Sequence, residues 1–168
     1  MPIVALSNDN PFVDGRQSAR ALEIRLGVER YFAELNWACL PELTLKDNRR
    51  ADLVALSPKG KIAIVEIKSS IEDFRADNKW PQYSQWCDEL IFATLPDVPA
   101  DIFPQEAGLM IADQYGADIF RPSPVLDLNA ARRKTMHLRF ARASAQRLTR
   151  CCNHAQIDSV TLAQDDQI

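Results

Sequence analysis

Apolar residues near the beginning of the chain recur at helical spacing. They stand three or four residues apart at Ile24, Val28, Tyr31, Phe32 and Leu35. Ser18 precedes them and has a side chain suited to cap the first turn of a helix. Leu22 and Leu26 lie on another side of the same helix. We therefore expect a helix over residues 17–35 that is buried on two faces.

The segments that follow are typical of short strands. Residues 37–45 alternate between apolar and polar and contain Pro41, which favours an irregular or edge strand. Residues 51–56 and 61–68 then form two apolar segments with a short polar connector between them. We expect these two segments to pair as a β-hairpin.

The connector of this hairpin fixes its register. Pro suits the first central position of a type I turn, and Gly suits the left-handed position after it, so Pro58-Lys59-Gly60 is a three-residue loop closed by a glycine bulge. Ser57 then faces Lys61 across the turn. The same register places Asp52 directly opposite Glu66.

The second half of the chain continues with alternating elements. A polar segment runs to residue 79, and Pro81 fits the first turn of a helix over residues 80–89. Strands are expected over 90–95, 108–113 and 118–121, with a proline-rich loop over 96–104. This order of elements predicts an α/β fold, a mixed β-sheet flanked by helices.

A last helix is expected from about residue 138. Its apolar residues make one seam, at Leu138, Ala141, Ala145, Leu148 and Cys152. Another side of the same helix carries arginines, at Arg139, Arg142, Arg147 and Arg150. Alternation between residues 136 and 140 leaves the start of the helix open.

Length and composition indicate a single globular domain. The 168 residues are 46% hydrophobic and 26% charged, which suits one compact core. We expect one domain over residues 1–168, with a core over about 17–152 and extensions at 1–16 and 153–168. No apolar stretch approaches the roughly 20 residues of a membrane span, and the beginning of the chain does not resemble a secretory signal. The expectation is a cytoplasmic protein without membrane contact.

Metal-binding cysteine motifs are missing from the sequence. The four cysteines show no Cys-x-x-Cys spacing, and His137 and His154 are the only histidines. We therefore expect reduced cysteines and no structural zinc.

Charge is distributed unevenly along the chain. The net charge is −3, yet residues 128–157 contain seven Lys and Arg residues and no Asp or Glu. A basic segment on an acidic body is what a surface that contacts phosphates needs. The alternative is a solvated helix face, and charge alone does not decide between the two.

The expected hairpin brings together three groups suited to phosphodiester hydrolysis. Asp52 faces Glu66, and Lys68 shares the strand face of Glu66 because successive side chains alternate. Asp52, Glu66 and the carbonyl of Ile67 could hold one Mg²⁺ or Mn²⁺ ion, which lowers the pKa of a bound water. Lys68 would orient that water and balance the charge that develops on the phosphate.

A lone Glu-x-Lys motif carries little information, because such pairs also occur as salt bridges on exposed strands. In this sequence the face of Glu66 also carries Ile62 and Ile64. The charged residues therefore replace apolar residues that would otherwise continue the face, which favours a functional site.

The residues around these groups resemble a known family. The segment Arg50–Leu56 followed by residues 64–70 resembles the core motif of the PD-(D/E)xK, or restriction-endonuclease-like, nuclease superfamily. Residues 71–77, 79–83, 87–88 and 138–142 resemble the MmcB family of bacterial DNA repair proteins. The resemblance spans about residues 21–148.

The resemblance implies a restriction-endonuclease-like fold, with Asp52 and Glu66 as metal ligands and Lys68 as the catalytic lysine. In this superfamily an acidic residue on the first helix often assists the metal, and Glu23 and Glu29 are available for that role or are simply solvated. Glu42 is a further candidate. The Gln-x-x-x-Tyr motif of the exonuclease-like branch is absent, because Gln82 is followed at once by Tyr83.

Basic residues near the expected site are candidates for DNA contacts. They are Arg49, Arg50, Arg75, Lys79, Arg139, Arg142 and Arg150. Trp80, Tyr83 and Trp86 could stack on bases, but three aromatics at this spacing are more often a core-facing stripe.

These observations favour a metal-dependent DNA endonuclease that acts in DNA repair. Two alternatives stay open, namely a catalytically silent DNA-binding accessory and a subunit that docks onto other repair proteins. The sequence leaves the oligomeric state open, and a dimer is an expectation only by analogy of fold.

Overall fold

The structure, a computed structural model, describes residues 18–165, with side chains described to residue 156. The expected extension over residues 1–16 therefore lies outside the described residues. The elements are α1 (Ala19–Glu34), β1 (Ala38–Thr44), β2 (Arg50–Leu56), β3 (Ile62–Ile67), α2 (Ile71–Ala76), η1 (Trp80–Trp86), β4 (Glu89–Thr94), η2 (Ala100–Ile102), β5 (Gly108–Ala112), β6 (Ala117–Arg121) and α3 (Ala130–Asp165).

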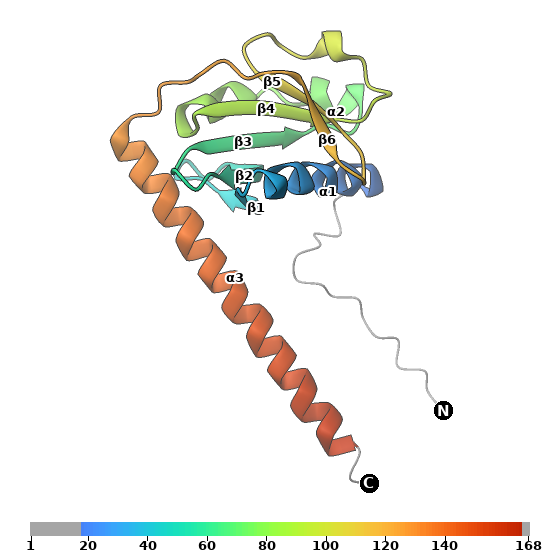
Figure 1. The fold of residues 1–168 in the computed structure, drawn as a ribbon, viewed down its shortest axis with the longest axis vertical. Helices are drawn as coiled ribbons and strands as arrows, with labels where there is room; N and C mark the ends of the chain where they lie inside the picture. Colours follow the sequence, from blue (N-terminus) through green and yellow to red (C-terminus); the bar gives the residue numbers. More distant parts are fainter. Residues whose placement is uncertain (1–17, 166–168) are drawn as a thin grey trace.

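Six strands form one mixed sheet whose order follows the chain, from β1 to β6. The pairs β1–β2, β2–β3 and β5–β6 are antiparallel, whereas β3–β4 and β4–β5 are parallel. The connections between the parallel strands contain α2 with η1 and then η2 (Figure 1). The predicted α/β class, a mixed sheet flanked by helices, is confirmed.

The β2–β3 hairpin has the predicted register. Leu53 pairs with Val65 and Leu56 with Ile62, and the amide of Ser57 donates to the carbonyl of Lys61 at 2.9 Å. Gly60 adopts φ of 83°, the left-handed conformation that the glycine bulge requires. The turn chemistry of the sequence was therefore sufficient to align the two strands.

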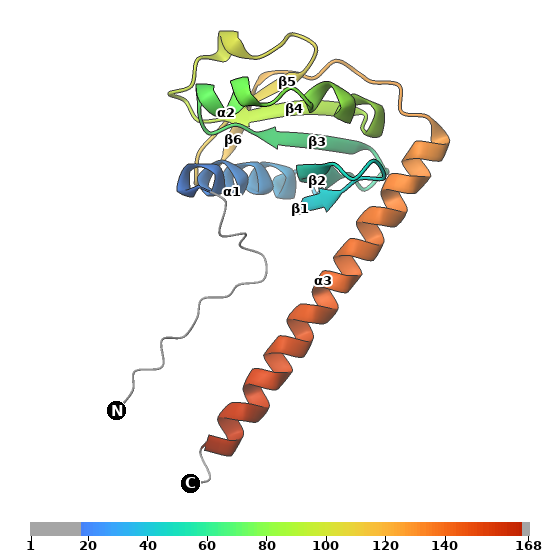
Figure 2. The same ribbon diagram turned by 180° about the vertical axis from the view of Figure 1, so that it is seen from behind.

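Two apolar cores cover the two faces of the sheet. Helix α1 packs on one face, where Ile24, Val28 and Phe32 join the odd-numbered residues of β3. On the other face, η1 and α3 cover the even-numbered residues Ile62 and Ile64 together with residues of β4 and β5. Helix α1 and helix α2 thus lie on opposite sides of the sheet, as Figures 1 and 2 show.

The segment after β3 differs from the prediction. Residues 71–76 form helix α2, which was expected to be only a polar segment. Ser70 caps it by accepting from the amide of Asp73 at 3.1 Å, so a capping signal was present in the sequence. The helix expected over residues 80–89 is instead the 3-10 helix η1, and it ends at Trp86 because residue 89 already pairs in β4.

Two predictions about helix faces are also wrong. On the second expected face of α1, Leu26 is 37% exposed and Leu22 is only partly buried, so that face is not buried as predicted; Leu35, after the end of α1, is 50% exposed. Helix α3 begins at Ala130 rather than near residue 138, with Asn129 accepting from the amide of Arg132 at 2.9 Å. Its packing face carries Met136 and Phe140, whereas the predicted apolar seam is exposed.

Within the described part of the chain, no helix is long and apolar enough to cross a membrane.

Candidate functional site

Asp52 and Glu66 lie on neighbouring strands and point to the same side of the sheet. The amide of Asp52 donates to Oε1 of Glu66 at 3.3 Å, and the amide of Ile67 donates to Oδ2 of Asp52 at 2.8 Å. Glu66 follows Ile62 and Ile64 on the face covered by η1 and α3. The structure therefore brings together the two carboxylates that the hairpin register predicted to face each other.

Both carboxylates hold protons more tightly than an exposed acid would. Burial raises the pKa of Asp52 to about 6, against which the hydrogen bond from Ile67 and the charge of Lys68 act. Burial, followed by the neighbouring Asp52 carboxylate, raises the pKa of Glu66 well above its ordinary value. Two acids with this behaviour at one place are a common signature of a functional site, because a bound cation relieves their repulsion.

Lys68 lies at the same end of β3, one residue beyond the strand, and is 6% exposed. Its Nζ is 2.7 Å from Oδ2 of Asp77 and 3.9 Å from Oε2 of Glu66. Burial would lower the pKa of Lys68, but the hydrogen bond to Asp77 and the charge of Glu66 raise it above its ordinary value. Lys68 is therefore a charged group held between two carboxylates.

The backbone at Lys68 is also fixed. Its amide donates to the carbonyl of Ala93, at 2.9 Å, and its carbonyl accepts from the hydroxyl of Thr94 at 2.7 Å. Thr94 is fully buried. These contacts attach the end of β3 to β4, so the direction in which the Lys68 side chain leaves the sheet is set by the parallel pairing.

Glu42 occupies the position of β1 that faces Asp52. The flanking pairs are Pro41 with Leu53 and Leu43 with Ala51, and Glu42 has φ of 55° between them. Its carboxylate forms an ion pair with Arg50. Glu42 thus lies beside the two carboxylates, and its charge adds to the rise in the pKa of Asp52.

The other acidic candidates lie on α1, which packs on the opposite face of the sheet. Glu29 forms an ion pair with Arg25 at 3.5 Å in the same helix. Glu23 is partly buried on this helix. Neither residue has a contact that would connect it with Asp52 or Glu66 in the described residues.

The donor set fits a hard divalent ion with incomplete protein coordination. Asp52 and Glu66 supply carboxylate oxygens, and the carbonyl of Ile67 directly follows Glu66 in the chain. Within residues 18–156, no group of three or more His, Cys, Asp and Glu side chains is placed to hold a metal. A Mg²⁺ ion would therefore keep several water ligands here, as this ion commonly does in proteins.

The predicted DNA-contacting residues separate into two groups. Arg49 forms an ion pair with Asp47 at 2.6 Å, and Arg50 pairs with Glu42, so both take part in structural contacts beside the hairpin. Arg75 on α2 and Lys79 before η1 are exposed. These two residues flank Asp77, the partner of Lys68, so they lie close in the chain to the carboxylate site.

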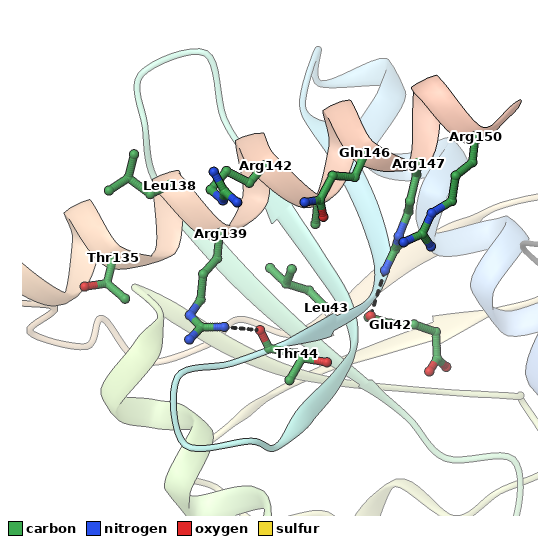
Figure 3. A pocket seen from close by; sticks show the side chains of 11 residues that line it. Glu42, Leu43, Thr44, Thr135, Leu138, Arg139, Arg142, Gln146, Arg147 and Arg150 are labelled. Atoms are coloured by element: carbon green, nitrogen blue, oxygen red, sulfur yellow. Dashed lines mark hydrogen bonds between the residues drawn. The ribbon is translucent and has the colours of Figure 1, made fainter. Parts of the chain in front are cut away.

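The remaining predicted arginines line a cleft between α3 and β1, which we call the basic groove. Its volume is about 580 Å³, and it is lined by Glu42, Leu43, Thr44, Thr135, Leu138, Arg139, Arg142, Ala143, Gln146, Arg147 and Arg150. Figure 3 shows Arg139 and Arg147 reaching from α3 to the strand. The groove begins at Glu42, the residue of β1 that faces Asp52, and therefore adjoins the carboxylate site.

Two of the groove arginines also attach the helix to the edge strand. Arg139 donates to the carbonyl of Thr44 at 3.2 Å, and Arg147 donates to the carbonyl of Glu42 at 2.8 Å and to that of Pro41 (Figure 3). Arg142 and Arg150 are exposed. The latter two are the groove residues best placed to meet a negatively charged ligand.

The three aromatic residues of η1 are part of the core, as the more conservative interpretation of the sequence expected. Tyr83 and Trp86 are 6% and 7% exposed, and Trp80 packs edge-on against Phe92 with ring centroids 5.5 Å apart. The hydroxyl of Tyr83 donates to the carbonyl of Arg50 at 3.0 Å, which supports β2 two residues before Asp52.

Sequence reasoning did not identify Asp77 or Thr94 as part of the site. Asp77 ends α2, a helix that was not predicted, and Thr94 lies on a strand paired with β3 in parallel. The Ser70 cap could have revealed α2. Nothing local in the sequence indicates which side chain would meet Lys68.

Comparisons with known proteins agree with this architecture. No curated protein matches the chain. A solved structure of a protein of unknown function from Silicibacter pomeroyi is 38% identical, with a TM-score of 0.75 over 78% of this chain and 90% of that chain. A family model described as DNA repair protein MmcB-like matches residues 8–155. The chain therefore belongs to the MmcB-like family of DNA repair proteins.

Proposed function

We propose that this protein is a Mg²⁺-dependent DNA endonuclease of the restriction-endonuclease-like superfamily, acting in DNA repair. The observation that carries the proposal is the pair of carboxylates Asp52 and Glu66, joined through the hairpin backbone, with the buried ammonium of Lys68 beside Glu66. Membership of a DNA repair family supports DNA as the substrate.

Each group of the site would have its own role in hydrolysis. Asp52, Glu66 and the carbonyl of Ile67 would hold the ion, which supplies an activated water and charge stabilisation at the phosphate. Lys68, charged and directed by Asp77, is placed to orient the attacking water and to balance negative charge on the phosphate. Hydrogen bonds of the Lys68 backbone with Ala93 and Thr94 fix the end of β3 against β4, which preorganises Glu66 and Lys68.

The substrate would approach over the basic side of the molecule. Arg142 and Arg150 line the basic groove together with Glu42, and Arg75 and Lys79 are exposed two residues before and after Asp77. Contacts to phosphates fix the position of DNA without reading its sequence. This distribution supports recognition of DNA by its backbone rather than by its bases.

A second candidate is a DNA-binding accessory without turnover. One ground for it is that the described residues place no group of three or more His, Cys, Asp and Glu side chains to hold a metal. A second ground is the ion pair between Lys68 and Asp77, which balances the charge of Lys68 without a bound metal. In that case the groove would bind DNA while the carboxylates served only structure.

The decisive experiment is a cleavage assay on linear, nicked, flapped and four-way DNA with Mg²⁺ or Mn²⁺. We expect at least one substrate to be cut by the wild type, and cleavage to fall to background with Asp52→Asn. Asp101→Asn, in the exposed first turn of η2, is the matched control and should keep full activity. DNA binding without cleavage of any substrate in either metal would support the accessory and contradict the nuclease.

A further inference from the structure

Helix α3 has three different sides. One side, with Met136 and Phe140, packs against the sheet and η1, and a second lines the basic groove. The third side carries an apolar series that we call the α3 seam. It comprises Leu138, Ala141, Ala145, Leu148, Cys152 and Ala155, all of which are exposed. Leu138, which also borders the groove, is 54% exposed and Leu148 is 66% exposed.

The spacing of the α3 seam is that of a coiled coil. Its members are separated alternately by three and four residues from Leu138 to Ala155. This repeat averages 3.5 residues, whereas a face that packs on a globular body follows the 3.6-residue period of a straight helix. A strict repeat of this kind keeps one stripe directed at a partner helix.

No element of the described chain provides that partner. Figures 1 and 2 show α3 leaving the body, with its second half beside no other helix or strand of residues 18–165. Thirty-six residues make a helix about 54 Å long. A second copy of this chain supplies such a partner, because it brings an identical seam of the same length.

Charge along the helix favours one orientation of two copies. Residues 130–150 carry seven Lys and Arg residues and no acid, whereas residues 151–165 carry Asp158 and Asp165 and no Lys or Arg. A parallel pair would place the two basic halves side by side. An antiparallel pair can instead place residues 130–142 of each helix, with five Lys and Arg residues, beside residues 151–163 of the other, which contain no Lys or Arg.

Side-chain size favours the same orientation and fixes a register. With Ala145 against Leu148 of the second copy, Ala141 meets Cys152 and Leu138 meets Ala155. Each layer then combines a small alanine with a larger side chain, and all six seam residues are used by both copies. Alternation of large and small side chains is how facing helices fill the space between them.

We propose that two copies of this chain associate through the α3 seam as an antiparallel coiled coil. Because the packing face and most of the basic groove lie on other sides of α3, each copy keeps its groove and its carboxylate site open. The proposal is independent of nuclease activity, since it rests on the helix alone.

Sedimentation velocity of the full chain over a wide range of concentration tests the association. We expect a dimer for the wild type and a monomer for Leu148→Glu, which should still fold because Leu148 is 66% exposed in the single chain. Asn153→Glu places the same charge on the same helix outside the seam and should remain dimeric. A wild type that stays monomeric at every concentration, or a Leu148→Glu variant that stays dimeric, would overturn the proposal.

Oxidative cross-linking tests the orientation. In a Cys151→Ser background, Ala141→Cys should form a disulfide with the native Cys152 of the second copy, which mass spectrometry of the linked peptides identifies. Disulfides joining position 141 to itself or Cys152 to itself would instead indicate a parallel pair. That result would overturn the antiparallel arrangement.

Discussion

Lys68 directs its ammonium group to Asp77, at 2.7 Å, and lies 3.9 Å from the nearer oxygen of Glu66. The lysine of the candidate site is thus held by a carboxylate that belongs to neither strand of the hairpin. Burial would raise the pKa of Asp77, but the hydrogen bond from Lys68 and that from the amide of Lys79 keep it below its ordinary value. Asp77 is therefore a charged positioning residue.

Asp77→Asn should release Lys68 toward Glu66, because a buried ammonium needs the nearest remaining carboxylate. A lysine on Glu66 competes with a divalent ion, so we expect weaker Mn²⁺ binding in calorimetry and a cleavage rate lower by about tenfold, or roughly 1.4 kcal/mol. Glu72→Gln, on the exposed side of the same short helix, is the control. If Asp77→Asn left the Mn²⁺ affinity and the cleavage rate unchanged, Asp77 would not be needed to position Lys68.

Asp52→Asn should stabilise the metal-free protein at neutral pH. The pKa of Asp52 is about 6 in the fold, against about 4 for an unfolded aspartate. Between these values the folded state keeps a proton that the unfolded state has lost, so the wild type loses stability as pH rises. The asparagine carbonyl can still accept from the amide of Ile67, and we expect a gain on the order of 1–2 kcal/mol at pH 7.

Chemical denaturation of both proteins at a series of pH values measures this difference. The gain should shrink as pH falls and approach zero below about pH 4, where both states of the wild type become protonated. For the same reason, metal affinity of the wild type should increase from about pH 5 to pH 8, since binding must displace protons. An Asp52→Asn variant less stable than the wild type at pH 7 would assign Asp52 a structural role.

Asp88→Asn should lower the free energy of unfolding at neutral pH and change it little at acidic pH. Asp88 accepts two hydrogen bonds from Arg133, at 2.7 and 2.6 Å, and one from the amide of Ile62 at 2.8 Å. Burial acts to raise the pKa of Asp88, but these contacts hold it below the ordinary value. The stabilisation is therefore present above about pH 4 and lost as pH falls through the lowered pKa of the folded state.

We expect a loss of about 2 kcal/mol at pH 7, measured by urea denaturation, because the half-buried guanidinium of Arg133 loses its charged partner. Asp97→Asn breaks a fully exposed pair with Arg20 and is the matched control, with little expected change. A similar small change for both variants would mean that the start of α3 is held by apolar packing alone.

Arg142→Gln with Arg150→Gln should weaken DNA binding and reduce its dependence on salt. Each lost phosphate contact on duplex DNA lowers the slope of log K against log salt by about 0.9, so the double variant should differ by about 1.8. Fluorescence anisotropy of labelled duplex at several salt concentrations measures the slope. The control is Arg30→Gln with Lys59→Gln, which removes the same charge from exposed positions on α1 and the hairpin turn. This double variant should leave the slope unchanged.

If both double variants changed the slope equally, binding would follow net charge rather than the basic groove. If neither changed it, α3 would be a solvated face or a protein contact. The triple neutralisation that includes Arg139 is a poorer test, because Arg139 also binds the carbonyl of Thr44 and its loss would disturb the attachment of α3.

Local chemistry in the sequence determined the hairpin that carries the candidate site. The loop Pro58-Lys59-Gly60 permits one turn geometry, and that geometry fixes which residues of β2 and β3 face each other. Alternation along the strands then places Glu66 on the face of Ile62 and Ile64. These steps involve only neighbouring residues, so the opposition of Asp52 and Glu66 followed from the sequence alone.

Tertiary structure decided the rest. Helix α2 and the contact of Asp77 with Lys68 depend on how the chain crosses from β3 to β4, which no periodic pattern records. The face on which α3 packs was also decided by its neighbours. Met136 and Phe140 pack in the apolar core beside η1, whereas Leu138 and Leu148 of the α3 seam are mostly exposed. Periodicity identifies which residues share a helix face, but burial depends on what lies opposite, and that is set by the packing of distant segments.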